Sequence, residues 1–355
     1  MNPLASAMGR MSNSSVAGPR MPSGLDSAKE WIAGFAAKRI LVIGDLMLDE
    51  FIWGKVSRIS PEAPVPVVNV TGESYYPGGA ANVARNVREF TSGAAVMGIA
   101  GTDPQGRRLL DLLGAAGIDT SAVQQDQAFF TTVKTRIVAR HQQVVRVDRE
   151  SKGPLSAEQT ERAMRLLDRA IGSVDAIIVA DYGKGYLTQP LADYICRTTS
   201  EHGKILTVDP HPHTSLRWHN ATAIKPNRME AFLAAGLRPS DPVEPALCDG
   251  PLLAAGTMLF GIWETRNLLI TLGEQGMVLL DPEAPPYHTP ARAKEVFDVS
   301  GAGDTAIAVF TLGLAAGAPP AEAAELANCA SGIVVGKLGT ATVTAAELQA
   351  ACAGL

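Results

Sequence analysis

The sequence predicts an α/β fold in which helices cover both faces of a mainly parallel β-sheet, with a small β-strand lid. Three observations predict this three-layer, doubly wound arrangement. Short apolar runs alternate with segments of helical periodicity, as successive βαβ units require. Several of these runs end at an acidic residue, at the edge where such sheets bind ligands. Two other stretches alternate apolar and polar residues, which is typical of exposed strands.

The body of the fold is expected to span residues 26–355. Residues 1–25 lack periodicity and are predicted to be a flexible N-terminal extension, with order beginning near Trp31. A helical stripe runs from Ala80 to Phe90. Buried strands are predicted at residues 39–44, 95–100, 174–180, 205–208 and 268–272. The acids that follow three of these strands are Asp45, Asp181 and Asp209, and we expect them at the ligand-binding edge.

Residues 51–77 and 129–149 interrupt this alternation of strands and helices. Both stretches alternate apolar with polar residues and are rich in Val, Thr and Pro. That pattern predicts exposed antiparallel strands that leave the α/β body and return to it. A layer placed beside the strand ends is suited to act as a lid over a ligand.

Composition excludes several classes of protein. The net charge of −5 gives no electrostatic reason to expect a nucleic-acid partner. No apolar run reaches the roughly 18 residues that a membrane span needs. The four cysteines lie far apart without metal-type spacing, which is typical of reduced thiols in a cytoplasmic protein.

One candidate catalytic segment runs from Ser300 through Gly301, Ala302 and Gly303 to Asp304. Glycines that open a helix let backbone N–H groups face an anion. An acid at the same place could take a proton from a hydroxyl nucleophile while those groups stabilise a phosphoryl group. The structural alternative is a tight turn in which Asp304 caps the helix.

The same glycines also fit the dinucleotide pattern G-x-G-x-x-A. That interpretation requires a strand directly before the glycines and an acid about 20 residues later, at the end of a second strand. Asp298 and Ser300 break the required strand, and the acids at the right distance, Glu322 and Glu325, lie in an Ala-rich helical segment. The sequence therefore disfavours an oxidoreductase.

Two other segments could contact ligands. Gly78, Gly79 and Asn82 stand at a helix start, where a ligand could approach the backbone and Asn82 could bind sugar hydroxyls. Asn227 and Glu230 are three residues apart, on one helix face, and could hold the waters of a Mg²⁺ that rides on ATP. Close helix packing and an ordinary helix cap are the respective structural alternatives.

Taken together, these segments resemble the ribokinase-like carbohydrate kinases from Arg39 to Thr344. The resemblance implies a ribokinase-like fold, the cofactors ATP and Mg²⁺, and Asp304 as the base with Gly301 to Gly303 as the anion hole. It implies sugar contacts for Asp45, Asp49, Gly78, Gly79 and Asn82. It implies nucleotide contacts for Asn227, Glu230, Thr271, Gly273, Gly276 and Asn328, with Glu230 reaching Mg²⁺ through water. Asp298 and Ser300 resemble ligands of a monovalent cation such as K⁺.

The segments 44–54 and 58–67 are more particular, since they resemble the kinase half of the bacterial heptose enzymes. That resemblance implies transfer of phosphate to the anomeric O1 of D-glycero-β-D-manno-heptose 7-phosphate. Lys184 and Arg136 are the predicted contacts of the distal phosphate, with Arg140, Arg146 and Arg149 as further candidates. Another sugar kinase of the same family and a catalytically silent sugar-binding protein are the alternatives.

Two further expectations follow from the resemblance. Such kinases often pair through their lids, so we expect a homodimer, with a small sugar phosphate as the other partner. The six histidines never form the H-x-G-H motif of a nucleotidyltransferase. We therefore expect a kinase alone, with adenylyl transfer left to another protein.

Overall fold

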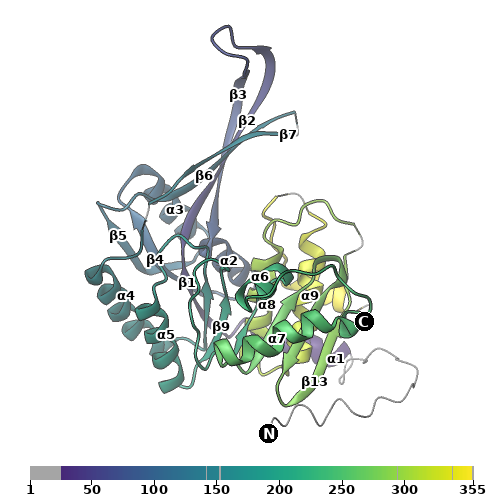
Figure 1. Cartoon of the computed structure of the whole chain (residues 1–355). Helices are drawn as coiled ribbons and strands as arrows, with labels where there is room; N and C mark the ends of the chain where they lie inside the picture. The colour runs from purple at the N-terminus through teal and green to yellow at the C-terminus, as the bar shows by residue number, and fades with distance from the viewer. Residues whose placement is uncertain (1–24, 141, 152, 294, 338, 354–355) are drawn as a thin grey trace.

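The computed structural model describes residues 25–140, 142–151, 153–293, 295–337 and 339–353 (Figure 1). The predicted extension lies outside these residues except for Leu25, which begins helix α1 (Leu25–Phe35). This helix includes Trp31, near which order is expected to begin. Its apolar stripe of Ala28, Ile32 and Phe35 is buried against the body.

A nine-stranded sheet forms the centre of the body, in the order β13-β12-β11-β10-β9-β8-β1-β4-β5. The strands from β11 to β5 in this order are parallel, and β12 and β13 are antiparallel to their neighbours. The mainly parallel sheet predicted from the sequence is thereby confirmed. Its strands are β1 (Arg39–Gly44), β4 (Gly93–Gly101), β5 (Asp119–Asp126), β8 (Ala176–Ala180), β9 (Ile205–Asp209), β10 (Ala223–Ile224), β11 (Asn267–Thr271), β12 (Met277–Asp281) and β13 (Ala284–Thr289).

Helices cover both faces of this sheet and complete the three layers (Figure 1). One face carries α4 (Ala157–Ala170), α5 (Gln189–Glu201), α6 (Arg228–Ala234) and α7 (Gly250–Trp263). The other carries α1, α2 (Ala80–Arg88), α3 (Pro104–Ala115), α8 (Ala302–Ala316), α9 (Pro320–Val334) and α10 (Ala345–Cys352). Because the sheet is covered on both sides, consecutive residues of β1 enter opposite cores: Leu41 packs under α4 and α5, and Val42 packs under α2 and α8.

A second sheet of four strands, in the order β3-β2-β6-β7, projects from the body as the predicted lid (Figure 1). Its strands are β2 (Leu46–Ile59), β3 (Pro66–Gly79), β6 (Thr132–Ala139) and β7 (Gln142–Arg149). The pairs β2–β3 and β6–β7 are antiparallel, as expected. The central pair β2–β6 is parallel, which the prediction of antiparallel strands missed. Each hairpin leaves the body along its first strand, so the two outgoing strands lie side by side.

The connection between body and lid places the site. Strand β2 begins at Leu46, one residue after Asp45 and two after the end of β1. The lid therefore rises directly from the carboxyl edge of the central sheet, where Asp45, Asp181 and Asp209 also lie. Among the described helices, none is both long and apolar enough to cross a bilayer.

Candidate active site

Asp45 is buried at the end of β1, and the chain itself uses its carboxylate. Oδ2 accepts the backbone N–H groups of Tyr182 and Lys184 at 3.0 and 3.1 Å, and Oδ1 accepts that of Tyr186 at 3.0 Å. Burial raises the pKa of Asp45, and the three N–H groups act against that shift. The predicted substrate contact is thus a residue that fixes the loop following β8.

Asp304 lies in the first turn of α8, and its carboxylate does not cap the helix. Tyr182 Oη donates to Oδ1 and Asn82 Nδ2 donates to Oδ2, each at 2.6 Å. The cap position belongs to Gly301, in a left-handed conformation with φ 81° and no side-chain cap. Burial raises the pKa of Asp304, whereas the hydrogen bonds from Tyr182 and Asn82 lower it. The capping role that the sequence allowed for Asp304 is therefore not the arrangement in the structure.

The start of α8 forms a cradle that could receive an anion. Gly301, Ala302 and Gly303 open the helix, where backbone N–H groups and the helix dipole favour negative charge. The Ala302 N–H donates to the Val299 carbonyl oxygen at 3.3 Å in this structure. A Cβ added at Gly303 would lie 3.6 Å from Lys225 Nζ, so this buried ammonium group borders the cradle. Lys225 also pairs with Asp209 at 3.0 Å. No strand directly precedes the glycines, since β13 ends at Thr289, and this disagrees with a dinucleotide fold.

Asn227 and Glu230 form a capping box at the start of α6. Asn227 Oδ1 accepts from the Glu230 N–H at 2.9 Å, and Glu230 Oε2 accepts from the Asn227 N–H at 2.8 Å. The capping box uses only Oε2 of Glu230. The negative charge of Glu230 helps to raise the pKa of Asp209. No group of three acids, histidines or cysteines suited to a metal ion occurs in the described part of the chain. Proteins commonly bind Mg²⁺ with only one or two carboxylates, because phosphate oxygens and water supply its other ligands.

The predicted nucleotide loop lies beside this helix. Asn227 forms an isolated parallel bridge with Thr271, the last residue of β11. Gly273 and Gly276 have φ values of 60° and 88°. A Cβ at Gly276 would lie 2.1 Å from the Thr289 carbonyl oxygen, so this turn requires glycine.

Asn328 is buried and acts behind the same region. Its Nδ2 donates to Thr289 Oγ1 at 2.8 Å and to the Pro290 carbonyl at 2.7 Å. Ala291 borders two cavities, one of about 890 Å³ that Gly332 also lines and one of about 550 Å³ that Pro290 also lines. Asn328 therefore holds in place a segment that lines both cavities.

Asp49 and Arg136 are joined at the base of the lid. Arg136 Nη1 donates to Asp49 Oδ1, and the two residues come from the paired strands β6 and β2. A Cβ at Gly78 would lie 2.4 Å from Asp49 Oδ2, so the glycine leaves room for this carboxylate. Gly79 has φ 59° and directly precedes α2, which carries Asn82. These predicted sugar contacts thus occupy one corner beside Asp304.

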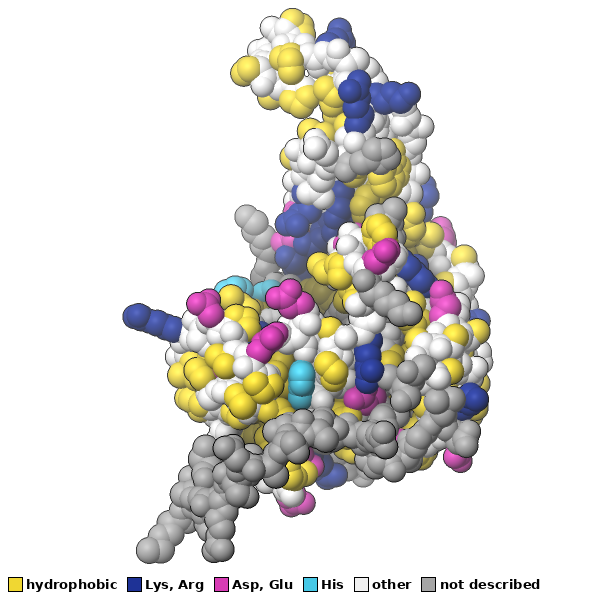
Figure 2. Space-filling view, turned by 90° about the vertical axis from the view of Figure 1, so that its right-hand side faces the viewer, with side chains coloured by type: hydrophobic (Ala, Val, Ile, Leu, Met, Phe, Trp, Pro, Cys, Tyr) yellow, Lys and Arg dark blue, Asp and Glu magenta, His cyan; other side chains and the backbone are white. Residues whose placement is uncertain are grey.

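Lys184 lies on the loop that Asp45 holds, and its Nζ pairs with Glu150 at 2.6 Å. Lys134 on β6 approaches the same Glu150 at 3.8 Å. Figure 2 shows Lys and Arg side chains gathered where the lid meets the body. Among the other candidate contacts of the distal phosphate, Arg146 forms an ion pair with Asp148, two residues later in β7.

Asp298 and Ser300 lie in the loop before α8. Asp298 Oδ1 accepts the Ser300 N–H at 2.9 Å, and Oδ2 accepts the Gly339 N–H at 3.2 Å. Burial acts to raise the pKa of Asp298, but these N–H donors outweigh it, and the pKa is lowered. The carboxylate is therefore favoured in its ionised form and oriented in the loop that leads into α8.

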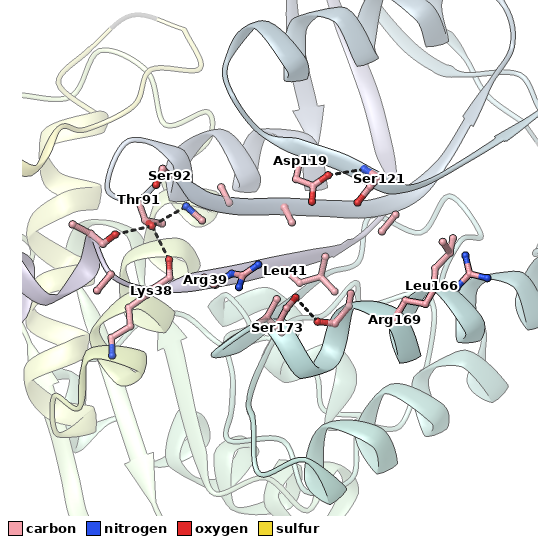
Figure 3. Close-up of a pocket in the computed structure, with 18 residues that line it drawn as sticks. Lys38, Arg39, Leu41, Thr91, Ser92, Asp119, Ser121, Leu166, Arg169 and Ser173 are labelled. Carbon is pink, nitrogen blue, oxygen red and sulfur yellow. Dashed lines mark hydrogen bonds between the residues drawn. The ribbon is translucent and has the colours of Figure 1, made fainter.

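A separate cavity of about 610 Å³ lies at the opposite, amino-terminal edge of the sheet (Figure 3). Arg39, Asp119 and Arg169 border it, and Asp119 Oδ1 accepts the Ser121 N–H at 2.8 Å. The predicted site residues do not line this cavity. A cavity of this size therefore does not coincide with the predicted site, which lies at the carboxyl edge of the sheet.

Tyr182 and Lys225 are site residues that the sequence did not single out for catalysis. Tyr182 belongs to the segment that continues β8, and its hydroxyl reaches a residue 122 positions later in the chain. Lys225 directly precedes the Pro226-Asn227 pair, at the end of β10. Its position after a buried strand was a usable signal, because a lysine there faces the same edge as the acids.

The buried acid Asp181 should make stability depend on pH. Thr214 Oγ1 and the Gly183 N–H donate to its carboxylate, but burial dominates and raises its pKa to about 6 from 3.8. The native state therefore keeps a proton between these values that the unfolded state releases. This contribution to the free energy of unfolding falls as the pH rises from about 4 to about 6. Asp181→Asn should lessen that fall in urea titrations, and an unchanged fall would contradict the assignment.

The chain was compared with known proteins. A family model described as pfkB family carbohydrate kinase matches residues 37–346. The bifunctional protein HldE of Desulfatibacillum aliphaticivorans is 44% identical over 316 residues, which cover 89% of this chain and 63% of that protein. HldE of Caulobacter vibrioides is 44% identical over 317 residues, with 89% and 64% covered. The chain thus spans less than two thirds of the length of these relatives.

Solved structures show the same fold. The structure titled as Escherichia coli phosphofructokinase-2 with substrates and products has a TM-score of 0.70 at 19% identity, covering 89% of this chain and 99% of that one. Arabidopsis thaliana ribokinase complexed with ribose and ATP has a TM-score of 0.67 at 15% identity, with the same coverage. The expected ribokinase-like fold is confirmed. From the family match and its extent, the chain belongs to the pfkB family of carbohydrate kinases.

Proposed function

We propose that the chain transfers the γ-phosphoryl group of ATP to the anomeric O1 of D-glycero-β-D-manno-heptose 7-phosphate, giving the 1,7-bisphosphate. This step would belong to the synthesis of ADP-heptose, a precursor of the lipopolysaccharide inner core. The observation that carries the proposal is the half-buried carboxylate of Asp304 beside the glycine cradle and the buried Lys225. The 44% identity to proteins named HldE supports a heptose as the sugar.

The chemistry assigned to Asp304 is that of a general base. Its carboxylate takes the proton of O1–H as O1 forms a bond to the γ-phosphorus, and the bond from that phosphorus to the bridging oxygen of ADP breaks. A hemiacetal hydroxyl is more acidic than an ordinary alcohol, so one carboxylate suffices near neutral pH. The N–H groups from Gly301 to Gly303 and the Lys225 ammonium group stabilise the charge on the transferred group.

The residues around α6 and the β11 turn suit the nucleotide. Bound Mg²⁺ would neutralise charge on the ATP phosphates, and Glu230 with Asn227 would hold its water ligands. Thr271, Gly273 and Gly276 border the phosphates and ribose, and Asn328 holds in place the segment proposed to border the base. Asp298 and Ser300 are proposed to bind a monovalent cation such as K⁺ next to the anion cradle.

The heptose is proposed to lie between Asp304 and the lid base. Asp49 accepts from sugar hydroxyls in an orientation that Arg136 fixes, and Gly78 and Gly79 let the sugar approach the backbone. Asn82 already donates to Asp304, so its contribution to the sugar is made through this carboxylate. The distal phosphate would replace Glu150 as the partner of Lys184. It would also accept hydrogen bonds from Nε and Nη2 of Arg136, which donate to no other residue in the described part of the chain.

A comparison of ATP turnover with heptose 7-phosphate, fructose 6-phosphate and ribose tests the proposed substrate. We expect the highest kcat/KM with heptose 7-phosphate. Asp304→Asn should lower kcat about 1,000-fold because the base is lost. Asp111→Asn, on the exposed face of α3, should leave the rate unchanged. Higher kcat/KM with fructose 6-phosphate or ribose would contradict the substrate, and an active Asp304→Asn enzyme would contradict the base.

Reversal of the charge at Lys184 tests the distal phosphate site. Lys184→Glu should raise the KM for the sugar phosphate about tenfold, because an attractive contact becomes repulsive. The KM for ATP should stay the same. Lys29→Glu on the exposed side of α1 is the matched control for the same charge change. An unchanged KM for the sugar phosphate would exclude Lys184 from this role.

We also propose that two chains pair through their lids. Strands β3 and β7 are the edges of the lid sheet, and exposed apolar side chains on the lid include Trp53, Val70 and Val147. Sedimentation at micromolar concentration should give twice the 37.2 kDa mass of one chain. Val147→Glu should favour the monomer, and Met258→Lys on α7 should not. A monomeric wild-type chain would refute this pairing.

A further inference from the structure

Asp304 is held at both of its oxygens by groups that come from other parts of the chain. The Tyr182 hydroxyl reaches Oδ1 and the Asn82 amide reaches Oδ2, both at 2.6 Å. Bonds of this length from an O–H or N–H group to an ionised acceptor are at the strong end of the range. The two donors leave each oxygen with one further lone pair, so the face that a substrate hydroxyl can meet is restricted.

The two donors are anchored independently. Asn82 accepts from Arg85 Nη1 at 3.2 Å, and its backbone carbonyl accepts from Asn86 Nδ2 at 3.0 Å. Asn86 in turn accepts from Thr305 Oγ1 at 2.7 Å, which ties α2 to the residue directly after the base. Asn82 is therefore connected through Asn86 to the helix that carries Asp304.

Tyr182 is fixed from the opposite side. Its own N–H is one of the three that Asp45 accepts, so the tyrosine leaves the end of β8 in one direction. Gly183 and Gly185 have φ values of 66° and 96°, which let the loop turn so that all three N–H groups reach one carboxylate. The strands β1 and β8 thus determine where the tyrosine hydroxyl lies.

We propose that Tyr182 is a positioning residue for the reaction: its hydroxyl, anchored through Asp45, orients the Asp304 carboxylate toward the sugar hydroxyl. The inference rests on the proposed role of Asp304 as the base. Burial and the adjacent carboxylate raise the pKa of Tyr182 well above its ordinary value. The phenol consequently stays protonated and remains a donor throughout the working pH range.

Other charged groups also face Asp304. Lys225 from the end of β10 lowers the pKa of the base, and Asp49 from β2 raises it. Asp209 from β9, which burial gives a pKa of about 7, lies close enough to interact with Asp304. These groups remain in place in a Tyr182→Phe variant, so a change in the pH profile of that variant reports the lost hydroxyl.

The test is steady-state kinetics of Tyr182→Phe from pH 5 to 9 with ATP and the sugar phosphate. We expect kcat to fall about tenfold, because a hydrogen bond to a charged group is lost. The KM for the sugar should change little. The lost donor no longer favours the ionised form of Asp304, so its pKa rises and the acidic limb of kcat moves to higher pH.

A second variant guards against a folding defect. Replacement of Tyr182 by 3-fluorotyrosine keeps the ring and strengthens the donor, so the acidic limb should move the other way, to lower pH. Tyr194→Phe is the matched control, since its hydroxyl donates to Asp168 at the same 2.6 Å on the surface of α5. That variant should keep the wild-type profile.

The outcomes separate the inference from the proposed function. If both Tyr182 variants keep the wild-type limb and kcat while Asp304→Asn is inactive, the positioning role is wrong and the base stands. If Tyr182→Phe raises the KM for the sugar without lowering kcat, Tyr182 is a substrate contact instead. If Asp304→Asn is active, both the inference and the assigned base fail.

Discussion

A half-buried carboxylate at a helix start is the constraint on which the rest of this site depends. Loss of water around a charged group is costly, so Asp304 must be surrounded by donors and cations if it is to act as a base. The structure supplies them from three places: Tyr182 after β8, Asn82 on α2 and Lys225 after β10. The parallel sheet achieves this because its strands all end at one edge.

Asp45 stabilises the same carboxyl edge of the central sheet. Its carboxylate accepts three N–H groups of the loop that follows β8, and it stands at the junction from which the lid rises. One buried acid thus connects strand β1, the lid and the tyrosine loop. In the proposed reaction, this connection would keep the lid base, where the sugar is proposed to bind, in a fixed position relative to Asp304.

The fold was largely predictable from the sequence, and the partners within the site were not. The run at β1 and the alternation in the lid are local patterns, and both are confirmed. The parallel pairing of β2 with β6 joins segments about 85 residues apart and leaves no local signal. The hydrogen bonds to Asp304 likewise span 122 and 222 positions, so spacing in the chain could not reveal Tyr182. The functional roles of the site residues stay predictions.

The most direct test of the account is the identity of the product, measured by ³¹P NMR after turnover of ATP with D-glycero-β-D-manno-heptose 7-phosphate. The account predicts a new phosphorus signal coupled to the anomeric proton, beside the retained signal of the 7-phosphate. A signal coupled to any other sugar proton, or turnover without a new sugar phosphate, would contradict it.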